Sequence, residues 1–378
     1  MASLYLFNPE NDLALVQNNA TYTAPSNAIR LHNAGALIPM WFCNNDDIIV
    51  APNTNLEWVK QIHSKFEING TILNASNIST ITELKPWGWS KHVCQQFIDS
   101  GINKSLLPTT EQLDKMRMLS HRRITIEISK YLQEQALISN PTIPFEAKCE
   151  QDILNFAHKH NSFYIKSPWS SSGRGVINSS SMCKAELIRQ ALGMINRQGS
   201  VICEKALDKV KDFAMLFYSD GNTIKYLGLS YFYNTETGTY LGNIIDSQDN
   251  ILQEFNNFNT TLKISELSHI LASTLSKLIC PHYIGYLGVD MMIYKNDNKF
   301  EIAPCVELNL RMTMGTVALL WSSKHLAKGA KGIMQIEYNP NNNATPHNNA
   351  IIVDKRLKSG TISLIPPDKY FNITISVK

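Results

Sequence analysis

Residues 163–176 read Phe163-Tyr164-Ile165-Lys166-Ser167-Pro168-Trp169-Ser170-Ser171-Ser172-Gly173-Arg174-Gly175-Val176. An apolar run that carries one lysine breaks at Pro168, and a second apolar run starts at Val176 after a string of small residues. The pattern predicts a strand, a flexible loop and a second strand. Because the loop has few large side chains, its backbone N–H groups could close around a phosphate, with Lys166 at its base. A solvated hairpin with a Ser/Gly tip is the alternative, since a lone Gly-x-Gly is a weak signal.

Two commoner phosphate-binding patterns are absent from the sequence. No Gly-Lys-Ser/Thr follows at the spacing of a P-loop, and no Gly-x-Gly-x-x-Gly opens a predicted helix. The formal charge of +3 and the lack of a dense Lys/Arg block argue against nucleic acid as a partner. No apolar run approaches the roughly 20 residues that a membrane span needs. We therefore expect neither nucleic acid nor a membrane as a partner.

The length of 378 residues suggests two or three domains at roughly 150 residues each. The seven cysteines are scattered and never spaced as Cys-x-x-Cys, which favours reduced, packed thiols in a cytoplasmic protein. The first residues have no basic region before an apolar segment, so we expect no signal peptide.

Residues 1–110 alternate short apolar runs with helical patterns, as a small α/β layer domain does. Strands are expected at residues 4–7, 37–42 and 47–50, and helices at residues 56–66 and 91–98. The segment Asn8-Pro9-Glu10-Asn11-Asp12 follows the first strand, where open α/β sheets place ligands. Glu10 and Asp12 are candidates for holding a cationic substrate group. A turn that caps a helix is the alternative, and the residue types favour it.

After residue 110 the pattern turns to helices and then to longer strands. Thr109 is the predicted cap of one helix, and Ser120 that of a second helix at residues 124–132. The polar, Asn-rich residues 234–260 are predicted to form a loop, and the last residues a small β appendage. The other predicted helices are residues 150–158, 184–195 and 262–279, and the other predicted strands are residues 201–207, 212–218, 223–232, 286–294 and 300–310.

The last two long strands carry candidate metal ligands. Asp290 is a lone carboxylate in an apolar strand, where it is unfavourable without a partner. Glu307, Asn309 and Arg311 are spaced by two, so they share one face of their strand. Carboxylate and amide oxygens are the ligands that Mg²⁺ prefers, and an arginine beside them could neutralise phosphate charge. A solvent-facing polar strand edge is the alternative for the second strand.

The pairing of these two strands adds a condition to the metal hypothesis. In the register that pairs Tyr294 with Phe300, the two carboxylates point to opposite faces of the sheet. A shift of one residue places Asp290 and Glu307 on one face. We therefore predict an odd register or a β-bulge between residues 300 and 307. Pro304 is its expected place, because proline donates no hydrogen bond to a ladder.

Taken in order, a Ser/Gly loop behind a strand lysine, a Glu-Lys-x-Leu strand end, a strand aspartate and a Glu-x-Asn-x-Arg strand resemble the ATP-grasp superfamily. The resemblance covers roughly residues 110–325, and the Asn-Pro-Glu-Asn-Asp start is also similar to ATP-grasp-like bacterial proteins. It implies an α/β (α+β) fold in which two subdomains enclose ATP. The implied parts are an N-terminal α/β domain, a first subdomain with the loop, a second subdomain with the metal strands and a C-terminal β appendage, at residues 1–110, 111–200, 201–335 and 336–378.

The resemblance also implies a nucleotide site. Lys166 would contact the α- and β-phosphates, and Asp212 would accept hydrogen bonds from the ribose. The triphosphate would be covered by the loop residues Ser171, Ser172, Gly173 and Gly175. The adenine edge would be read by the hinge residues Glu204, Lys205, Ala206 and Leu207. Arg122 or Arg123 stands where the family usually has a lysine, and the sequence leaves the choice between them open.

The metal and the chemistry follow from the same resemblance. Mg²⁺, or Mn²⁺, would be held by Asp290, Glu307 and Asn309. The implied catalytic cations are Lys166, Arg174 and Arg311, the last facing the γ-phosphate or an acyl phosphate. The implied activity is that of an ATP-dependent ligase, which joins a small-molecule or peptide carboxylate to an amine through an acyl phosphate. A small-molecule kinase and a catalytically silent nucleotide-binding protein remain alternatives. Substrate identity and oligomeric state stay open.

Overall fold

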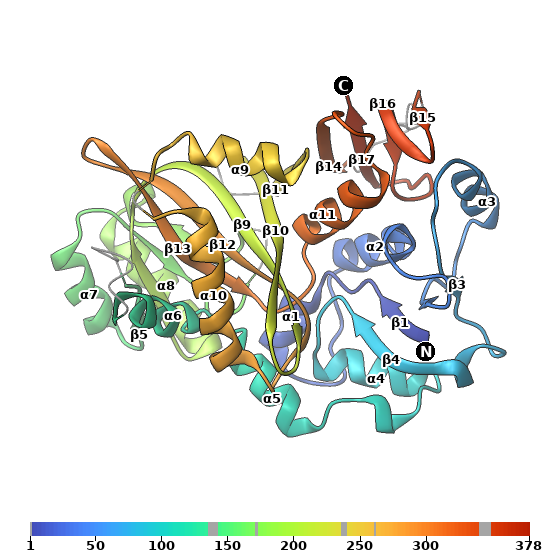
Figure 1. The fold of residues 1–378 in the computed structure, drawn as a ribbon. Coiled ribbons are helices and arrows are strands. Elements are labelled where there is room, and N and C mark those ends of the chain that lie inside the picture. The colour runs from blue at the N-terminus through green and yellow to red at the C-terminus, as the bar shows by residue number, and fades with distance from the viewer. Residues whose placement is uncertain (1, 135–142, 171–172, 236–239, 261, 340–348) are drawn as a thin grey trace.

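The computed structural model describes residues 2–134, 143–170, 173–235, 240–260, 262–339 and 349–378. The described strands form three sheets, with helices packed around them (Figure 1). The chain begins in a small parallel sheet, passes through a small antiparallel sheet, and continues into a large antiparallel sheet that runs to the C-terminus. This mixed α/β architecture agrees with the fold class that the sequence predicts.

The N-terminal sheet has the strand order β3-β2-β1-β4, and all of its pairings are parallel. Its strands are β1 (Ala2–Leu6), β2 (Ile48–Ile49), β3 (Thr71–Ile72) and β4 (Ile81–Pro86). Its α-helices are α1 (Asn11–Gln17), α2 (Ser26–Ala34), α3 (Leu56–Lys65) and α4 (Lys91–Asp99), with short 3₁₀ helices η1 (Ile38–Trp41), η2 (Ile78–Thr80) and η3 (Lys104–Leu106). Every residue of β1 is buried, and β1 is an inner strand that lies between β2 and β4.

The second unit starts with two helices, α5 (Thr110–Leu119) and α6 (Ile124–Glu134). Thr109 and Gln112 form a reciprocal capping box at the start of α5, as predicted. The antiparallel sheet that follows has the order β5-β8-β6-β7. It comprises β5 (Phe145–Ala147), β6 (Phe163–Lys166), β7 (Val176–Asn178) and β8 (Val201–Lys205), with α7 (Glu150–Lys159), η4 (Ser179–Ser181) and α8 (Lys184–Gln198).

The large sheet has nine strands in the order β13-β12-β9-β10-β11-β14-β17-β16-β15, and each described pairing is antiparallel. Its first five strands in chain order are β9 (Asp208–Asp220), β10 (Ile224–Asn234), β11 (Tyr240–Ile245), β12 (Ile284–Asn296) and β13 (Lys299–Asn309). Its last four are β14 (Gly332–Tyr338), β15 (Ile351–Val353), β16 (Arg356–Ser363) and β17 (Phe371–Val377). The helices beside it are α9 (Gln248–Asn256), α10 (Ile264–Ile279) and α11 (Met314–His325).

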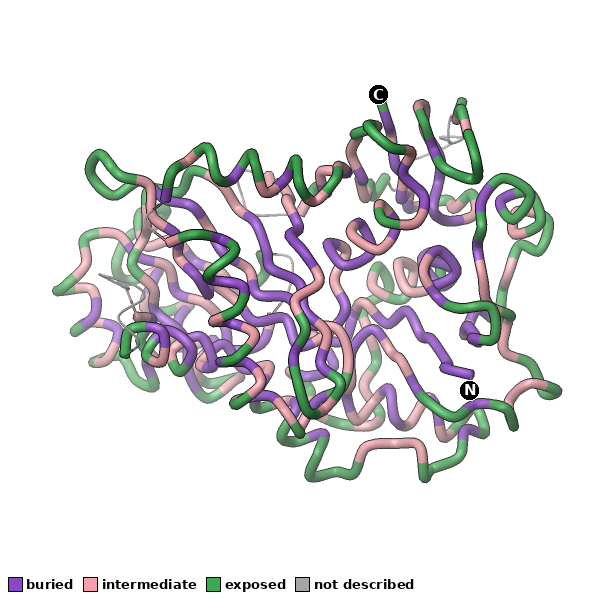
Figure 2. The backbone as a smooth tube through the Cα atoms, in the orientation of Figure 1, coloured by how far each residue is buried: buried purple, intermediate pink, exposed green. Residues whose placement is uncertain are grey.

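The largest buried core joins the two ends of the chain. It includes Tyr5, Phe7 and Trp41 from the N-terminal unit together with Trp321 of α11 and Ile375 of β17. The Trp41 indole N–H donates to the Leu364 carbonyl at 2.9 Å, which fixes this contact. In Figure 2 the buried strands run through the interior of both halves, while exposed backbone lies mainly on outer helices and loops. The C-terminal strands therefore continue the large sheet and also cover the N-terminal unit.

The C-terminal appendage proposed from the sequence is thus part of a larger layer. β14 spans the predicted boundary at residue 335, and it pairs with β11 on one side and β17 on the other. Hydrogen bonds therefore cross the boundary without interruption. The division of the chain into four parts stays a prediction.

Three local predictions are wrong. Residues 37–42 were expected to be a strand but contain η1, because Pro39 starts a 3₁₀ turn and a short buried run has no helix or strand signature. Ser120 ends α5 instead of capping α6, and its hydroxyl donates to the Met116 carbonyl. Residues 234–260 include β11, in which three of the six residues are buried, and α9, which buries Ile251 and Phe255. In the described part of the chain, no helix combines the length and hydrophobicity that crossing a membrane requires.

Candidate active site

The predicted strand–loop–strand is present. β6 and β7 are antiparallel neighbours, and Lys166 lies opposite Val176 at the base of the loop. The backbone N–H of Ser167 donates to the Gly175 carbonyl at 2.8 Å, which closes the neck of the loop. Gly175 has a φ of +65°, and a Cβ atom there would lie 2.5 Å from the Ser167 Oγ. This position therefore requires glycine both for its backbone conformation and for space.

The tip of the loop is described in part. Ser171 and Ser172, predicted to cover a triphosphate, lie outside the described residues. Gly173 has a φ of +73°, and Arg174 beside it is exposed. The Arg174 charge is close enough to Tyr22 to oppose the rise in the Tyr22 pKa that burial causes. The loop thus reaches toward the N-terminal unit.

Arg122 ties this loop to the large sheet. Its backbone N–H donates to the Pro168 carbonyl at 3.0 Å, and its Nη1 donates to the Ser167 carbonyl at 2.7 Å and to the Ser170 hydroxyl at 2.6 Å. Its Nη2 donates to Glu307 Oε1 at 2.7 Å. The Arg122 side chain is 6% exposed, so this is a buried charge with a carboxylate partner.

Arg123, the other candidate for this position, lies elsewhere. Its Nη2 pairs with Glu146 at 3.2 Å and contacts the His121 ring. Of the two arginines that the sequence could not separate, Arg122 is therefore the one at the loop and the metal strand. The turn between α5 and α6 points the two consecutive side chains to different partners.

The predicted carboxylate pair is formed. Asp290 on β12 lies directly opposite Glu307 on β13, which puts both side chains on one face of the sheet. The register is odd, because Tyr294 pairs with Glu301, and a bulge follows between Ala303 and Glu307. Residues 304–306 of β13 lie opposite one residue of β12. The odd register, one of the two alternatives that the parity argument allowed, is confirmed, and a register shift also falls at Pro304, the expected place of a bulge.

The pKa values of the two carboxylates shift in opposite directions. Burial and the nearby Glu307 charge raise the pKa of Asp290 to about 7, although Asn309 donates a hydrogen bond to it at 3.1 Å. Burial also acts to raise the pKa of Glu307, but Arg122, Lys166 and Arg311 outweigh burial and hold this pKa below its usual range. The side chain of Glu307 remains 25% exposed, so this carboxylate is accessible to solvent.

The donor set fits a hard divalent cation. Among the described residues there is no group of three or more His, Cys, Asp or Glu side chains that could hold a metal. Two carboxylates on one face are present, and the Asn309 amide beside them adds a further oxygen. Such a partial oxygen set suits Mg²⁺, which usually takes one or two carboxylates and completes its shell with water and substrate phosphates. The raised pKa of Asp290 is consistent with this, because a bound cation would offset the repulsion from Glu307.

Two predicted cations are already paired. Lys166 makes a direct ion pair with Glu204 of β8, and both side chains are at most 14% exposed. Glu204 was predicted to belong to the adenine hinge, and its other carboxylate oxygen is buried without a partner among the described residues. Arg311 is held by Asp12, whose two oxygens accept from Nε and Nη2 at 2.8–3.1 Å. Asp12 therefore has a cation within the protein as its partner.

The remaining predicted residues border this cluster. β8 ends at Lys205, and the N–H of Ala206 donates to the Ser162 carbonyl at 3.0 Å. The Leu207 carbonyl accepts from the Lys209 N–H at 2.9 Å, so it is used by a turn. Asp212 on β9 accepts from Lys209 Nζ at 2.8 Å, and its charge is felt by Asp290. Sequence reasoning did not find Asp12 as the partner of Arg311, and no local pattern links residues so far apart.

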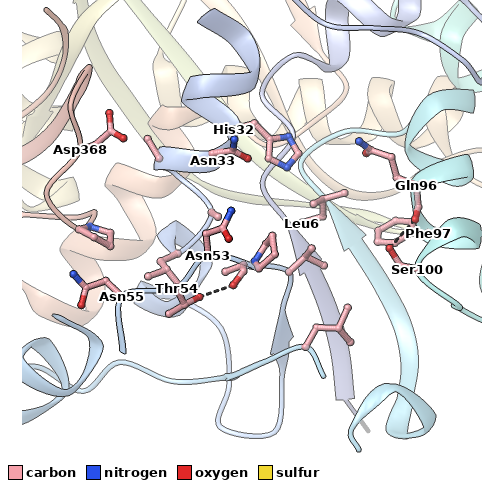
Figure 3. Close-up of a pocket in the computed structure, with 18 of the residues that line it drawn as sticks. Leu6, His32, Asn33, Asn53, Thr54, Asn55, Gln96, Phe97, Ser100 and Asp368 are labelled. Atoms are coloured by element: carbon pink, nitrogen blue, oxygen red, sulfur yellow. Dashed lines mark hydrogen bonds between the residues drawn. The ribbon is translucent and has the colours of Figure 1, made fainter. Parts of the chain in front are cut away.

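A cavity of about 550 Å³ opens near the carboxyl ends of β1 and β2 (Figure 3). Polar side chains that Figure 3 labels around it include His32, Asn33, Asn53, Thr54 and Gln96. None of its described wall residues is lysine or arginine. This cavity is separate from the cluster around Arg122 and Glu307, whose members do not line it.

The cavity is nevertheless linked to the charge cluster by two contacts. His32, in its wall, lies 2.9 Å from Glu10 Oε1. Glu10 precedes α1, and Asp12 in the first turn of α1 holds Arg311. The turn that the residue types of this segment favour is present, and the binding of a cationic substrate group stays a prediction. The segment turns the chain into α1, and it presents its carboxylates to His32 and Arg311.

No family model matches the sequence, and no curated protein is significantly similar to it. Solved structures do match. Biotin carboxylase of Campylobacter jejuni, solved as a β,γ-ATP complex, is 11% identical with a TM-score of 0.53, over 100% of this chain and 87% of that one. Phosphoribosylamine–glycine ligase of Thermotoga maritima is 10% identical with a TM-score of 0.52, over 99% of this chain and 92% of that one. N5-carboxyaminoimidazole ribonucleotide synthetase of Thermus thermophilus is 10% identical with a TM-score of 0.50, over 100% and 93%.

These matches define the class of fold. The likeness to these enzymes extends over the whole of this chain. The chain has the ATP-grasp fold, as the sequence predicts. At such low identity the likeness shows the fold and leaves the substrate open.

Proposed function

We propose that this protein is an ATP- and Mg²⁺-dependent ligase that activates a substrate carboxylate as an acyl phosphate for attack by an amine. The observation that carries the proposal is the meeting of Lys166, Arg122 and the carboxylate pair Asp290–Glu307 beside a glycine-closed loop. The matched biotin carboxylase, whose structure holds a β,γ-ATP ligand, and the matched glycine ligase support ATP as the second substrate.

The residues have distinct tasks in this proposal. Lys166 and Arg122 neutralise charge on the triphosphate, and the loop neck at Gly175 allows its backbone donors to come close. A bound Mg²⁺ would be held by Asp290, Glu307 and Asn309, and it would stabilise negative charge on the phosphates. Because phosphoryl transfer depends on positioning and charge neutralisation, no covalent nucleophile from the protein is needed.

A bound nucleotide would compete for cations that are paired with carboxylates of the protein. Glu204 holds Lys166, and Glu307 holds Arg122, so each cation is kept in place by a carboxylate. When a phosphate arrives, it competes with these carboxylates for the same N–H groups. Arg311 is oriented by Asp12 and by the bond from its Nη1 to the Met312 carbonyl, and its remaining N–H groups would bind the reacting phosphate or acyl phosphate.

The cavity near the ends of β1 and β2 is the proposed place for the other substrate. Parallel sheets bind ligands beyond the carboxyl ends of their strands. Because its described walls offer amides, hydroxyls and carboxylates but no lysine or arginine, they suit an amine better than a second phosphate. The His32–Glu10 and Asp12–Arg311 contacts connect this cavity to the phosphate cleft.

The test measures ADP release from Mg-ATP against a panel of carboxylates, each with and without a mixture of amines. A ligase should release ADP with one carboxylate class, and hydroxylamine should trap the acyl phosphate as a hydroxamate. ADP release with a stable phosphorylated product, formed equally well without amines, would replace the ligase by a kinase. ATP binding in calorimetry without any turnover across the panel would leave a nucleotide-binding protein.

A further inference from the structure

A second cavity, of about 410 Å³, lies where the N-terminal unit meets the large sheet. One wall comes from β4, the edge strand of the parallel sheet, and the opposite wall comes from the ends of β9 and β12. The segment 105–108 and the start of α5 close one side. Neither Lys166 nor Glu307 lines it, so it is distinct from the proposed phosphate cleft.

Two cross-strand pairs face this cavity from two different sheets. Tyr5 on β1 lies beside Lys85 on β4, and Tyr218 on β9 lies directly opposite Tyr286 on β12. The rings of the second pair meet edge to face, with centroids 5.0 Å apart. All four residues line the cavity. A strand pair on each side fixes these side chains, because register and face are set by the two ladders.

The three tyrosine hydroxyls have no hydrogen-bond partner among the described residues. Tyr5 is only 7% exposed as a residue, so most of its ring is buried while its hydroxyl faces the cavity. Burial, followed by the neighbouring Tyr218, raises the pKa of Tyr286 to about 12, so this hydroxyl keeps its proton at neutral pH. Burial likewise raises the pKa of Tyr5 and Tyr218, and the Lys85 charge opposes this rise at Tyr218. Three O–H donors therefore face one space.

Lys85 adds a positive charge to this group of donors. Its ammonium lies 2.8 Å from Glu83 and 5.6 Å from the centre of the Tyr5 ring. Glu83 is also held by the Ser3 hydroxyl at 2.8 Å, and its side chain is 45% exposed. Because an ammonium has three N–H groups, Lys85 can bind a further acceptor while it keeps Glu83.

The rest of the wall combines apolar surface with a few polar side chains, among them Glu83, Gln112 and His282. Phe42, Trp87 and Trp89 contribute aromatic rings, and Pro39 and Pro281 add rigid apolar surface. Aromatic rings pack well against another ring in offset or edge-to-face geometry. A donor-rich patch beside aromatic walls is complementary to a planar ligand that carries acceptor oxygens. A cation would meet the Lys85 ammonium, and the Glu83 carboxylate in the same wall is already paired with that ammonium.

We propose that this cavity is a binding site for a small aromatic carboxylate. Its carboxylate accepts hydrogen bonds from the hydroxyls of Tyr5, Tyr218 and Tyr286 and from the Lys85 ammonium, and its ring lies against Trp87 and Trp89. The site stands on observations independent of the proposed ligase function, and either inference can fail without the other.

Calorimetric titration with benzoate tests the site, with acetate and benzylamine as matched probes. Acetate has the carboxylate without the ring, and benzylamine has the ring with the opposite charge. The site predicts saturable benzoate binding at millimolar concentration and much weaker binding of the other two. Equal binding of benzylamine and benzoate, or no saturable binding of benzoate, overturns the proposal.

Variants then locate the binding. Tyr218→Phe combined with Tyr286→Phe keeps both rings and removes two donors, so benzoate affinity should fall about tenfold or more. Tyr226→Phe is the matched control, because Tyr226 is a neighbouring strand tyrosine that does not line the cavity. Tyr5→Phe and Lys85→Met provide further tests on the opposite wall. Variants that retain the wild-type melting temperature and bind benzoate as tightly as the wild type overturn the assignment. ATP affinity should not change in any of them.

Discussion

The proposed phosphate cleft, around Arg122, Lys166 and Glu307, differs from the cavity near the ends of β1 and β2 in the charges of its side chains. The cleft concentrates full charges in pairs, with Arg122 on Glu307, Lys166 on Glu204 and Arg311 on Asp12. The cavity near β1 and β2 has walls that carry amides and hydroxyls, with no lysine or arginine among the described residues. The comparison teaches that a cavity alone does not find the chemistry here. The residues proposed to bind a triphosphate are the ones that form these charge pairs.

The largest effect is expected when a carboxylate is removed from the proposed phosphate cleft. Asp290→Asn should lower ATP turnover at least about 10²-fold, because it removes one of the two charged ligands proposed for the metal. Asp220→Asn is the control, because it makes the same substitution at an exposed hairpin turn away from the cleft. Steady-state ADP release measures both. Wild-type turnover in the Asp290 variant would remove its assigned role.

A second test compares a buried ion pair with an exposed one. Arg122→Ala leaves Glu307 without its partner and removes two contacts to the loop neck, so the free energy of unfolding should fall by about 2–4 kcal/mol. Arg189→Ala breaks an exposed pair with Glu186 one helical turn away and should leave the urea midpoint unchanged. Urea unfolding followed by circular dichroism gives both values. Equal midpoints for the two variants would contradict the anchoring role of Arg122.

A smaller effect is expected at the neck of the loop. Gly175→Ala and Gly199→Ala both place alanine at a positive φ, so each should cost about 1 kcal/mol of stability. A Cβ at residue 175 also meets the Ser167 side chain, whereas a Cβ at residue 199 has nothing within 4 Å. Only Gly175→Ala should therefore weaken binding of ATP in calorimetry. Equal ATP affinities in the two variants would separate the loop neck from nucleotide binding.

A further predicted effect is a pH dependence of stability. The pKa of Asp290 is raised to about 7 by burial and by Glu307, against about 3.9 in an unfolded chain. Between these values the native state binds more protons than the unfolded state, so this group's contribution to stability falls as pH rises from about 4 through 7. Asp290→Asn should remove this decline, and Mg²⁺ should reduce it in the wild type. Urea unfolding of both proteins across this pH range measures the difference. A wild-type pH profile parallel to that of the variant would contradict the raised pKa.

Much of the fold and part of the site could be predicted from the sequence. The loop after Lys166, the carboxylate strands and the odd register are local or depend on residue parity, which a sequence shows directly. The choice between Arg122 and Arg123 could not be made, because consecutive residues in a turn are separated by tertiary contacts. The Asp12–Arg311 pair joins residues 299 positions apart, and no periodicity signals such a contact. The roles assigned to the nucleotide-binding residues remain predictions.

The shared core of the first and last segments has a consequence for how the chain is made. Trp41 is 1% exposed in the finished protein, and part of its cover is Trp321 and the carbonyl of Leu364. Ribosomes add about 5–20 residues per second, so the N-terminal sheet must wait on the order of tens of seconds for those partners. During this delay one apolar face of the nascent sheet is open to solvent or to a chaperone. A fragment that stops at residue 110 should therefore aggregate when expressed alone.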